Sequence, residues 1–220
     1  MRISKSPEDR KSEILDAAEL LFLSKGYTRA TINDILREVG IAKGTFYYHF
    51  QSKEEVMDAI VMRYIESGVE AAAAIAADPS LTAHEKIFRI VTSGGKEADG
   101  KERMIEQLHQ ISNAEMHQKS LVESILRLTP VLTNVVEQGI EEGAFRTDYP
   151  RETVEFLLVS SQFLFDEGIF RWRPEELARK AAAFASMMEA ALGAKRGSFG
   201  YMLGVMAKET DDPERPREGS

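Results

Sequence analysis

The sequence contains no cysteine, a single tryptophan and no long apolar run. The absence of cysteine excludes a disulfide framework, a thiolate metal site and a cysteine nucleophile. Residues 1–8 contain no apolar stretch, so we expect no signal peptide. The longest uncharged stretch in the middle of the chain, Phe156 to Phe165, is too short to span a bilayer. We therefore expect a cytoplasmic protein that does not associate with a membrane.

Strand signals are also scarce, because no alternating run of β-branched and aromatic residues is closed by Asn-Gly or Asp-Gly. Helical spacing of apolar residues, in contrast, recurs along most of the chain. We predict an all-α protein with helices at 7–25, 31–39, 42–49, 53–77, 82–93, 98–112, 115–142, 151–169 and 174–192. Pro130 lies inside one of these segments and should kink it or split it in two. From residue 195 the helical pattern weakens, and 211–220 has the composition of a disordered tail.

The overall charge argues at first against a nucleic-acid partner. The chain has 28 Lys and Arg against 36 Asp and Glu, a net charge of -8, and its pI is about 5.2. Resolved along the chain, residues 1–53 carry nine basic and seven acidic residues, or +2, and the remainder carries -10. This asymmetry indicates two parts with different partners.

Two short predicted helices, Thr31–Val39 and Ala42–His49, are joined by a tight turn at Gly40-Ile41. This is the pattern of a helix-turn-helix, in which the first helix crosses the DNA backbone and the second enters the major groove. The sequence thus predicts an N-terminal three-helix DNA-binding domain over residues 1–53.

The second of these helices carries side chains that suit DNA. Lys43 can contact a phosphate or a guanine, Gly44 lets the backbone approach the duplex, and Thr45 can contact a base edge. Tyr47, Tyr48 and His49 have polar tips that can reach phosphates. The alternative is that the aromatic residues simply form the core of a helical bundle. We expect this of Phe46 and Phe50, but adjacent residues of one helix cannot all point inward.

These residues resemble a known signature. The runs Gly26–Ile35 (GYTRATINDI), Val39–Phe50 (VGIAKGTFYYHF) and Ser52–Glu54 (SKE) are similar to the DNA-binding region of the TetR/AcrR family of transcriptional regulators. The resemblance implies DNA contacts at Thr31, Ala42, Lys43, Gly44, Thr45, Tyr47, Tyr48, His49 and Lys53. It also implies a homodimer on a palindromic double-stranded DNA operator, and an effector-binding C-terminal domain.

We therefore expect residues 54–194 to form an effector-binding and dimerisation domain. Segment 151–169 has too many apolar residues for one helix face, and segment 174–192 is rich in alanine and methionine. A dimer interface is predicted at Phe156, Val159, Phe163, Ala181, Ala185, Met187 and Met188. The alternative is a single large monomer core. Residues 195–220 form the remainder, in which the apolar stretch 198–206 is either a docking helix or a flap.

A small-molecule pocket is a further expectation. Its predicted walls are Phe88, Met104, Leu108, Met116, Leu121, Ile125, Phe156 and Phe163, with polar groups from His109, Asn113 and Gln162. His109, Asn113 and His117 are spaced to share one helix face, and Glu106 and His84 could complete a metal site. We favour the interpretation that these histidines are exposed to solvent or satisfied within the core, so no metal site is predicted.

The leading hypothesis is a ligand-responsive repressor that binds its operator as a homodimer and is released by a small-molecule effector, with no cofactor. A second hypothesis is a DNA-bound structural or cell-division factor that has the same helix-turn-helix but binds no effector. A third is an enzyme, which we do not expect. The sequence has no nucleophile elbow, phosphate loop, His-Glu zinc motif or convincing carboxylate pair.

Overall fold

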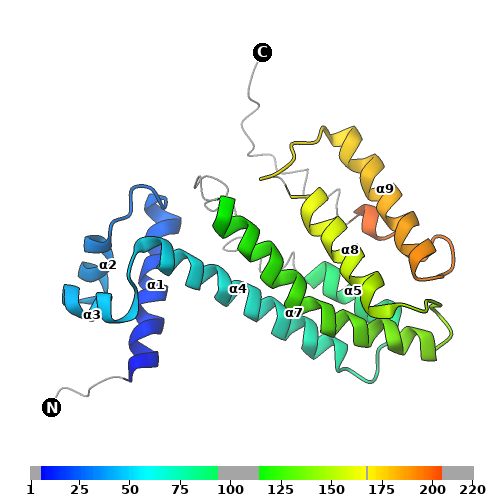
Figure 1. Ribbon diagram of the computed structural model, residues 1–220, viewed down its shortest axis with the longest axis horizontal. Helices are drawn as coiled ribbons and strands as arrows, with labels where there is room; N and C mark the ends of the chain where they lie inside the picture. The colour runs from blue at the N-terminus through cyan, green and yellow to red at the C-terminus, as the bar shows by residue number, and fades with distance from the viewer. Residues whose placement is uncertain (1–5, 94–113, 167, 205–220) are drawn as a thin grey trace. The chain divides into compact units, whose positions relative to one another are not determined.

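The computed structural model describes residues 6–93, 114–166 and 168–204 (Figure 1). Within these ranges every regular element is an α-helix, which confirms the predicted fold class. The predicted helix at 98–112 and the tail at 211–220 lie outside the described residues. In the described part of the chain, no helix combines the length and the apolar character needed to cross a membrane.

The helices are α1 (Pro7–Lys25), α2 (Ile32–Val39), α3 (Lys43–His49), α4 (Lys53–Ala76), α5 (Ala83–Ser93), α7 (Ala114–Glu141), α8 (Pro150–Leu164) and α9 (Pro174–Ala191). The chain forms two compact units. The first comprises the described residues of 1–68 and 97–122, and the second those of 69–96 and 123–220. The first unit thus extends past residue 53 into α4.

Local side-chain bonds set the ends of the first helices. Ser6 Oγ accepts a hydrogen bond from the Asp9 amide at 3.1 Å, and the Asp9 carboxylate accepts one from the Ser6 amide in return. Helix α1 ends where Gly26 takes a φ of 81°. Helix α2 ends at Gly40, which is left-handed with a φ of 70°. Both glycines adopt a conformation that other residues rarely reach.

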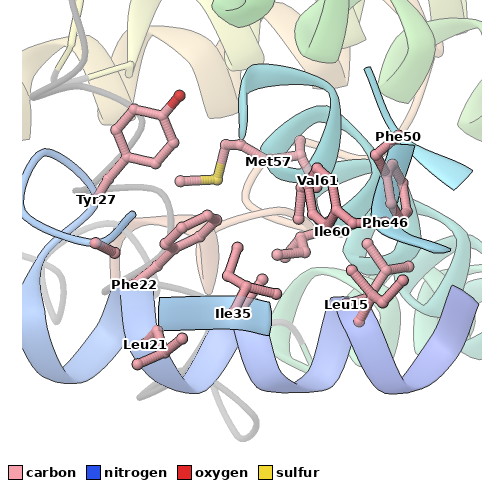
Figure 2. Packing of buried hydrophobic residues seen from close by; sticks show 14 of the residues in the cluster. Leu15, Leu21, Phe22, Tyr27, Ile35, Phe46, Phe50, Met57, Ile60 and Val61 are labelled. Atoms are coloured by element: carbon pink, nitrogen blue, oxygen red, sulfur yellow. The ribbon is translucent and has the colours of Figure 1, made fainter. Parts of the chain in front are cut away.

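The core of the first unit is built mainly from α1 to α4, with Met116 from α7 (Figure 2). Ile14, Phe22, Ile35 and Ile60 are fully buried at its centre. Each large side chain buried in this way contributes about 1.5–3 kcal/mol. On the surface of the unit, Arg63 of α4 donates to Asp16 and Glu19 of α1, at 2.6 Å for Asp16. These bonds fix α1 against α4 outside the apolar core.

The core of the second unit draws on α5, α7, α8, α9 and the segment after α9. The loop between α7 and α8 is tied to the end of α9, because the Arg146 amide donates to the Leu192 carbonyl at 2.7 Å. Gly193 has a φ of +57°, and a Cβ there would lie 2.5 Å from the Arg146 carbonyl oxygen. Only glycine fits at residue 193, where the chain passes close to the Arg146 carbonyl.

The segment after α9 packs into this core up to the last described residue. Phe199 is fully buried, and Met202 is nearly so. The Glu189 carboxylate on α9 accepts from the backbone amides of Gly197 and Phe199, at 2.8 and 3.3 Å. The described part of 198–206 is therefore docked on the second unit.

Two predictions need adjustment. Of the two outcomes expected at Pro130, a kink or a split, the split does not occur, because α7 runs through the proline as one helix of 28 residues. Helix α8 ends at Leu164 rather than at residue 169. Beyond it, the Asp166 carboxylate accepts from the amides of Gly168 and Ile169 at 2.8 and 3.1 Å, which forms a turn in place of further helix.

Candidate nucleic-acid interface

Helix α3 has one buried side and one exposed side. Phe46 and Phe50 are 0% and 1% exposed, so the prediction that both belong to the core is confirmed. Tyr47 and Tyr48 are 38% and 75% exposed, in agreement with the prediction that they do not point inward. The buried phenylalanines thus fix which side of this short helix faces solvent.

The exposed side of α3 carries polar groups of several kinds. At the start of the helix, the N-cap Ala42 and the first two helical residues, Lys43 and Gly44, are also exposed. The Lys43 ammonium lies 5.7 Å from the centre of the Tyr47 ring. The rings of Tyr48 and His49 meet edge to face at 4.9 Å. An ammonium, two phenols and an imidazole are therefore present on one short helix. These groups are hydrogen-bond donors suited to phosphates and base edges.

Gly44 has no packing reason to be glycine. A Cβ at this position would meet no atom of the chain within 4 Å, and the residue lies in an ordinary helical conformation. Glycine inside a helix costs up to about 1 kcal/mol relative to alanine. Nothing in the described structure offsets that cost.

Thr31 has a structural use that its prediction as a DNA contact did not include. Its hydroxyl accepts from the Asp34 amide at 3.2 Å and donates to the Asp34 carboxylate at 2.8 Å, and its own amide donates to the same carboxylate. These bonds, with the Lys25 ammonium at 3.2 Å, lower the pKa of Asp34 to about 2. Both donors of Thr31 therefore serve to cap α2.

Lys53 is likewise engaged within the chain. Its ammonium donates to the carbonyls of Tyr27 and Ala30 at 2.8 and 3.0 Å, and it lies 4.1 Å from the centre of the Tyr27 ring. The Tyr27 hydroxyl donates to the neighbouring Glu54 carboxylate at 3.2 Å. Burial, with the nearby carboxylate second, raises the pKa of Tyr27. Sequence reasoning missed this cluster, although Tyr27 and Glu54 both lie in the TetR-like signature.

The predicted pocket residues are spread over both units. Met104, Leu108, His109, Asn113 and the possible ligand Glu106 lie outside the described residues. Met116 is buried in the core of the first unit. Leu121 belongs to the same unit but not to that core cluster. In the second unit, Phe88, Phe156 and Phe163 are exposed and Ile125 is half-buried. Gln162 donates to Ser124 at 3.0 Å.

Among the described residues, no three His, Cys, Asp or Glu side chains are grouped so that they could hold a metal ion. His84, one of the histidines considered for such a site, instead packs against two aromatic rings. The centres of the Phe145 and Phe199 rings are 4.8 and 5.0 Å from the imidazole. Burial lowers the pKa of His84.

The predicted interface residues fall into two groups. Phe156, Val159, Phe163 and Met187 are exposed, by 73%, 49%, 50% and 43%. Ala181, Ala185 and Met188 are at most 6% exposed in the single chain, and Ala185 and Met188 belong to the core of the second unit. These three have almost no surface left for a second copy, so their assignment to an interface is corrected to the chain's own core.

Comparison with known proteins places this arrangement in a family. Residues 14–60 match "Bacterial regulatory proteins, tetR family", and residues 96–187 match "Tetracyclin repressor-like, C-terminal domain". The HTH-type transcriptional repressor KstR2 of Rhodococcus jostii RHA1 is 28% identical over 144 residues, which is 63% of this chain and 69% of that protein.

Solved structures share the fold. A TetR-family regulator from Pectobacterium atrosepticum superposes with a TM-score of 0.64 at 18% identity, over 86% of this chain and 97% of that one. The SmeT–triclosan complex gives a TM-score of 0.59 at 22% identity, over 86% of this chain and 94% of that one. Together with the exposed helix-turn-helix, these matches show that the chain belongs to the TetR family of transcriptional regulators.

Proposed function

We propose that this protein is a ligand-responsive repressor, which binds a palindromic operator as a homodimer through the exposed side of α3 and is released by a small-molecule effector. It is proposed to act in the cytoplasm as a regulator rather than as an enzyme, without a cofactor. The observation that carries the DNA-binding part is Gly44, an exposed helical glycine that the chain itself does not require.

A glycine at the second position of α3 gives a DNA backbone or base edge room to approach the helix. Any side chain at residue 44 would project from the same exposed side as Lys43 and Tyr48. A partner that contacts α3 this closely would explain why a helix of seven residues keeps its least favourable residue. The neighbouring Lys43, Tyr47, Tyr48 and His49 supply phosphate contacts in this proposal, and Thr45 supplies a base contact.

The charge distribution supports the same assignment. The net charge of -10 on residues 54–220 discourages non-specific attachment to DNA. Residues 1–53 carry only +2, so one copy of the helix-turn-helix binds DNA weakly and two copies must act together. A dimer places two recognition helices on two half-sites, which restores affinity without a strongly basic surface.

The proposed dimer contact is the exposed apolar side of α8 with Met187 of α9. Phe156, Val159 and Phe163 are spaced three and four residues apart, so they lie along one side of α8. Exposed apolar side chains in such a contiguous row indicate a protein interface. Helices α8 and α9 pack against each other within the second unit, which supports a four-helix contact between two copies.

The proposal of a small-molecule effector rests on family membership and on the name of a similar fold, the SmeT–triclosan complex. The repressor function follows the name of the KstR2 relative. Helices α4 and α7 each belong to both compact units, so they are covalent routes by which an effector in the second unit could move the DNA-binding helices.

The test is binding to DNA from upstream of the protein's own gene and its neighbours, measured by fluorescence anisotropy over a series of salt concentrations. We expect Lys43→Ala to weaken binding and to reduce the salt slope by about 0.9, the value of one lost phosphate contact. Thr45→Ala should change sequence preference by about 1–3 kcal/mol at one base pair.

The matched control is Lys195→Ala, which removes an equal charge from an exposed position in the second unit. It should leave both the affinity and the slope unchanged. Equal effects of Lys43→Ala and Lys195→Ala, with no change of preference for Thr45→Ala, would contradict the proposal that α3 reads DNA.

A further inference from the structure

The cations of the first unit differ in whether the chain itself already binds their charge. Lys11 and Lys43 are exposed, and among the described residues neither ammonium has an ion-pair or hydrogen-bond partner. Every other arginine and lysine described in this unit is engaged. Arg29 and Lys53 donate to backbone carbonyls, and the ion pairs are Arg10 with Glu13, Lys25 and Arg37 with Asp34, Arg63 with Asp16 and Glu19, and Lys119 with Asp58.

The two unpaired ammonium groups lie near opposite ends of α3. Lys43 is the first residue of that helix, and its Nζ is 5.7 Å from the centre of the Tyr47 ring. Lys11 belongs to α1, and its Nζ is 5.7 Å from the centre of the ring of Phe50, the C-cap of α3. Helix α3 therefore has an unpaired positive charge near each end, although only one of the two belongs to it.

The core of the first unit fixes the position of Lys11. Leu15 lies four residues after Lys11, so both are on the same side of α1. Leu15 is 7% exposed and belongs to the same core as Phe46 and Phe50, and Figure 2 shows the three side chains together. Figure 1 shows α3 alongside the amino-terminal half of α1. Lys11 thus lies at the edge of a buried contact between α1 and α3.

The carboxylates of α1 leave the charge of Lys11 available. Asp9 accepts from the Ser6 amide, Glu13 pairs with Arg10 at 2.7 Å, and Asp16 pairs with Arg63 at 2.6 Å. Glu8, three residues before Lys11, is exposed and forms no ion pair with it. A ring contact at an exposed site is worth only about 0.5–1 kcal/mol, and it uses none of the three N–H donors of the ammonium.

We propose that Lys11 is a phosphate ligand, so that the DNA-contacting surface of each copy includes α1 as well as the helix-turn-helix. This inference rests on the proposed function, in which α3 enters the major groove. Seven residues at about 1.5 Å each give α3 a length of about 10 Å, and the groove is about 12 Å wide. Cations beyond the two ends of a helix that crosses the groove reach the phosphate backbones on its two sides. Lys43 serves one side and Lys11 the other.

The experiment measures binding by fluorescence anisotropy over a salt series, on an operator duplex and on a scrambled duplex. It compares the wild type with Lys11→Met, Lys11→Arg and Lys43→Met. Methionine keeps an unbranched stem over the Phe50 ring but removes the charge. Lys11→Met should reduce the salt slope by about 0.9 for each copy bound, which weakens binding about fivefold per copy at about 0.15 M salt. The loss should be the same on both duplexes, because a phosphate contact carries no sequence information, and it should vanish toward about 1 M salt.

Lys11→Arg should keep the slope of the wild type. The matched control is Lys119→Met, which removes an equal charge from a cation of the same unit that is already paired with Asp58. It should change the slope much less than Lys11→Met does, because exposed charges that do not touch phosphates are screened by salt.

A reduced slope for Lys43→Met beside an unchanged slope for Lys11→Met would overturn this inference and leave the proposed function intact. Equal slope changes for Lys11→Met and Lys119→Met would also overturn it, since net charge alone would then explain the effect. A loss of affinity in Lys11→Met that persists at about 1 M salt would instead show a packing role against Phe50. A wild-type protein that binds neither duplex would overturn the proposed function and this inference with it.

Discussion

At the scale of single residues, two helical glycines have opposite surroundings. A Cβ at Gly44 would meet no atom within 4 Å, whereas a Cβ at Gly139 of α7 would lie 2.0 Å from Cδ2 of the buried Phe145. The chain therefore requires glycine at residue 139 for packing, and its use of glycine at residue 44 has to be explained by a partner.

This contrast predicts opposite effects of the same substitution. Gly44→Ala should raise the free energy of unfolding of the first unit by about 0.5–1 kcal/mol, because alanine favours the helix. It should weaken operator binding about tenfold or more, which corresponds to about 1.4 kcal/mol. Urea denaturation and anisotropy titration measure the two effects.

Gly139→Ala is the matched control. It should lower the free energy of unfolding by about 1–3 kcal/mol, because the core around Phe145 has no room for a methyl group. A Gly44→Ala protein that is more stable and binds DNA as well as the wild type would show that α3 is not approached closely by DNA.

His84 makes the second unit sensitive to acid. Burial against Phe145 and Phe199 lowers the pKa of His84 from the ordinary 6.5, and the charge of the Glu142 carboxylate opposes this shift without reversing it. The unfolded chain then binds a proton that the folded chain does not, so stability falls as the pH drops from about 6.5 toward the folded pKa.

His84→Phe should remove this dependence while keeping an aromatic ring in place. We expect the melting temperature of the wild type to fall more between pH 7 and pH 5.5 than that of the variant. Parallel curves for the two proteins over that interval would show that His84 does not carry the effect.

Sequence reasoning at this scale succeeded for residues whose partners are near in sequence. It also succeeded for Phe46 and Phe50, whose burial follows from their four-residue spacing on one side of the chain. It did not find the contacts of Lys53, because the two carbonyls to which Lys53 donates lie 26 and 23 residues earlier. It also could not place Ala181 and Ala185, since small residues suit a monomer core and an interface equally.

At the scale of the helices, the predicted starts of α1 and α2 were correct because caps are local. Ser6 with Asp9 and Thr31 with Asp34 each form reciprocal bonds over three residues, which can be read from the sequence. The end of α8 was predicted five residues too late, because apolar spacing continues through Phe165 and Ile169. The signal that was missed is Asp166 followed by Gly168, a turn pair.

Helix α7 shows how packing overrides local preference. Pro130 lacks the N–H that would bond to the Leu126 carbonyl, a cost of about 3 kcal/mol in a helix interior. The helix continues because side chains beyond Pro130, including Val135 and Val136, are almost fully buried. Of the kink or split that the local rule predicted, tertiary contacts prevent the split.

The prediction from this balance is that Pro130→Ala stabilises the protein. Pro130 is exposed, so its replacement should cost no packing, and a gain of about 1–3 kcal/mol in the free energy of unfolding is expected. Thermal and urea denaturation measure it. A decrease in stability would show that the proline is needed for the course of α7.

At the scale of the whole molecule, the chain forms two compact units, and its two family matches cover residues 14–60 and 96–187. The fold class, the helix-turn-helix and the family could be predicted from the sequence because the signature at Gly26–Glu54 is long and ordered. The pocket stays a prediction, because Met104, Leu108, His109 and Asn113 lie outside the described residues.

The dimer proposal makes a direct prediction for the exposed side of α8. Phe156→Asp should convert the dimer into a monomer, because it places a charge at the most exposed apolar residue of that side, which is 73% accessible in the single chain. Sedimentation velocity at micromolar protein measures the change. Leu126→Asp, at a residue of α7 that is 59% exposed, is the control and should leave the dimer intact. A wild-type monomer, or equal effects of the two variants, would contradict the assignment of this side.

Hydroxyl-radical footprinting of the wild-type protein on its operator tests the central claim most directly, that two copies of α3 read DNA together. The account predicts two symmetric protected patches on one side of the duplex, separated by a whole number of helical turns, and the loss of both in Gly44→Ala and Phe156→Asp. A single asymmetric patch, or protection that is the same on operator and scrambled DNA, would contradict it.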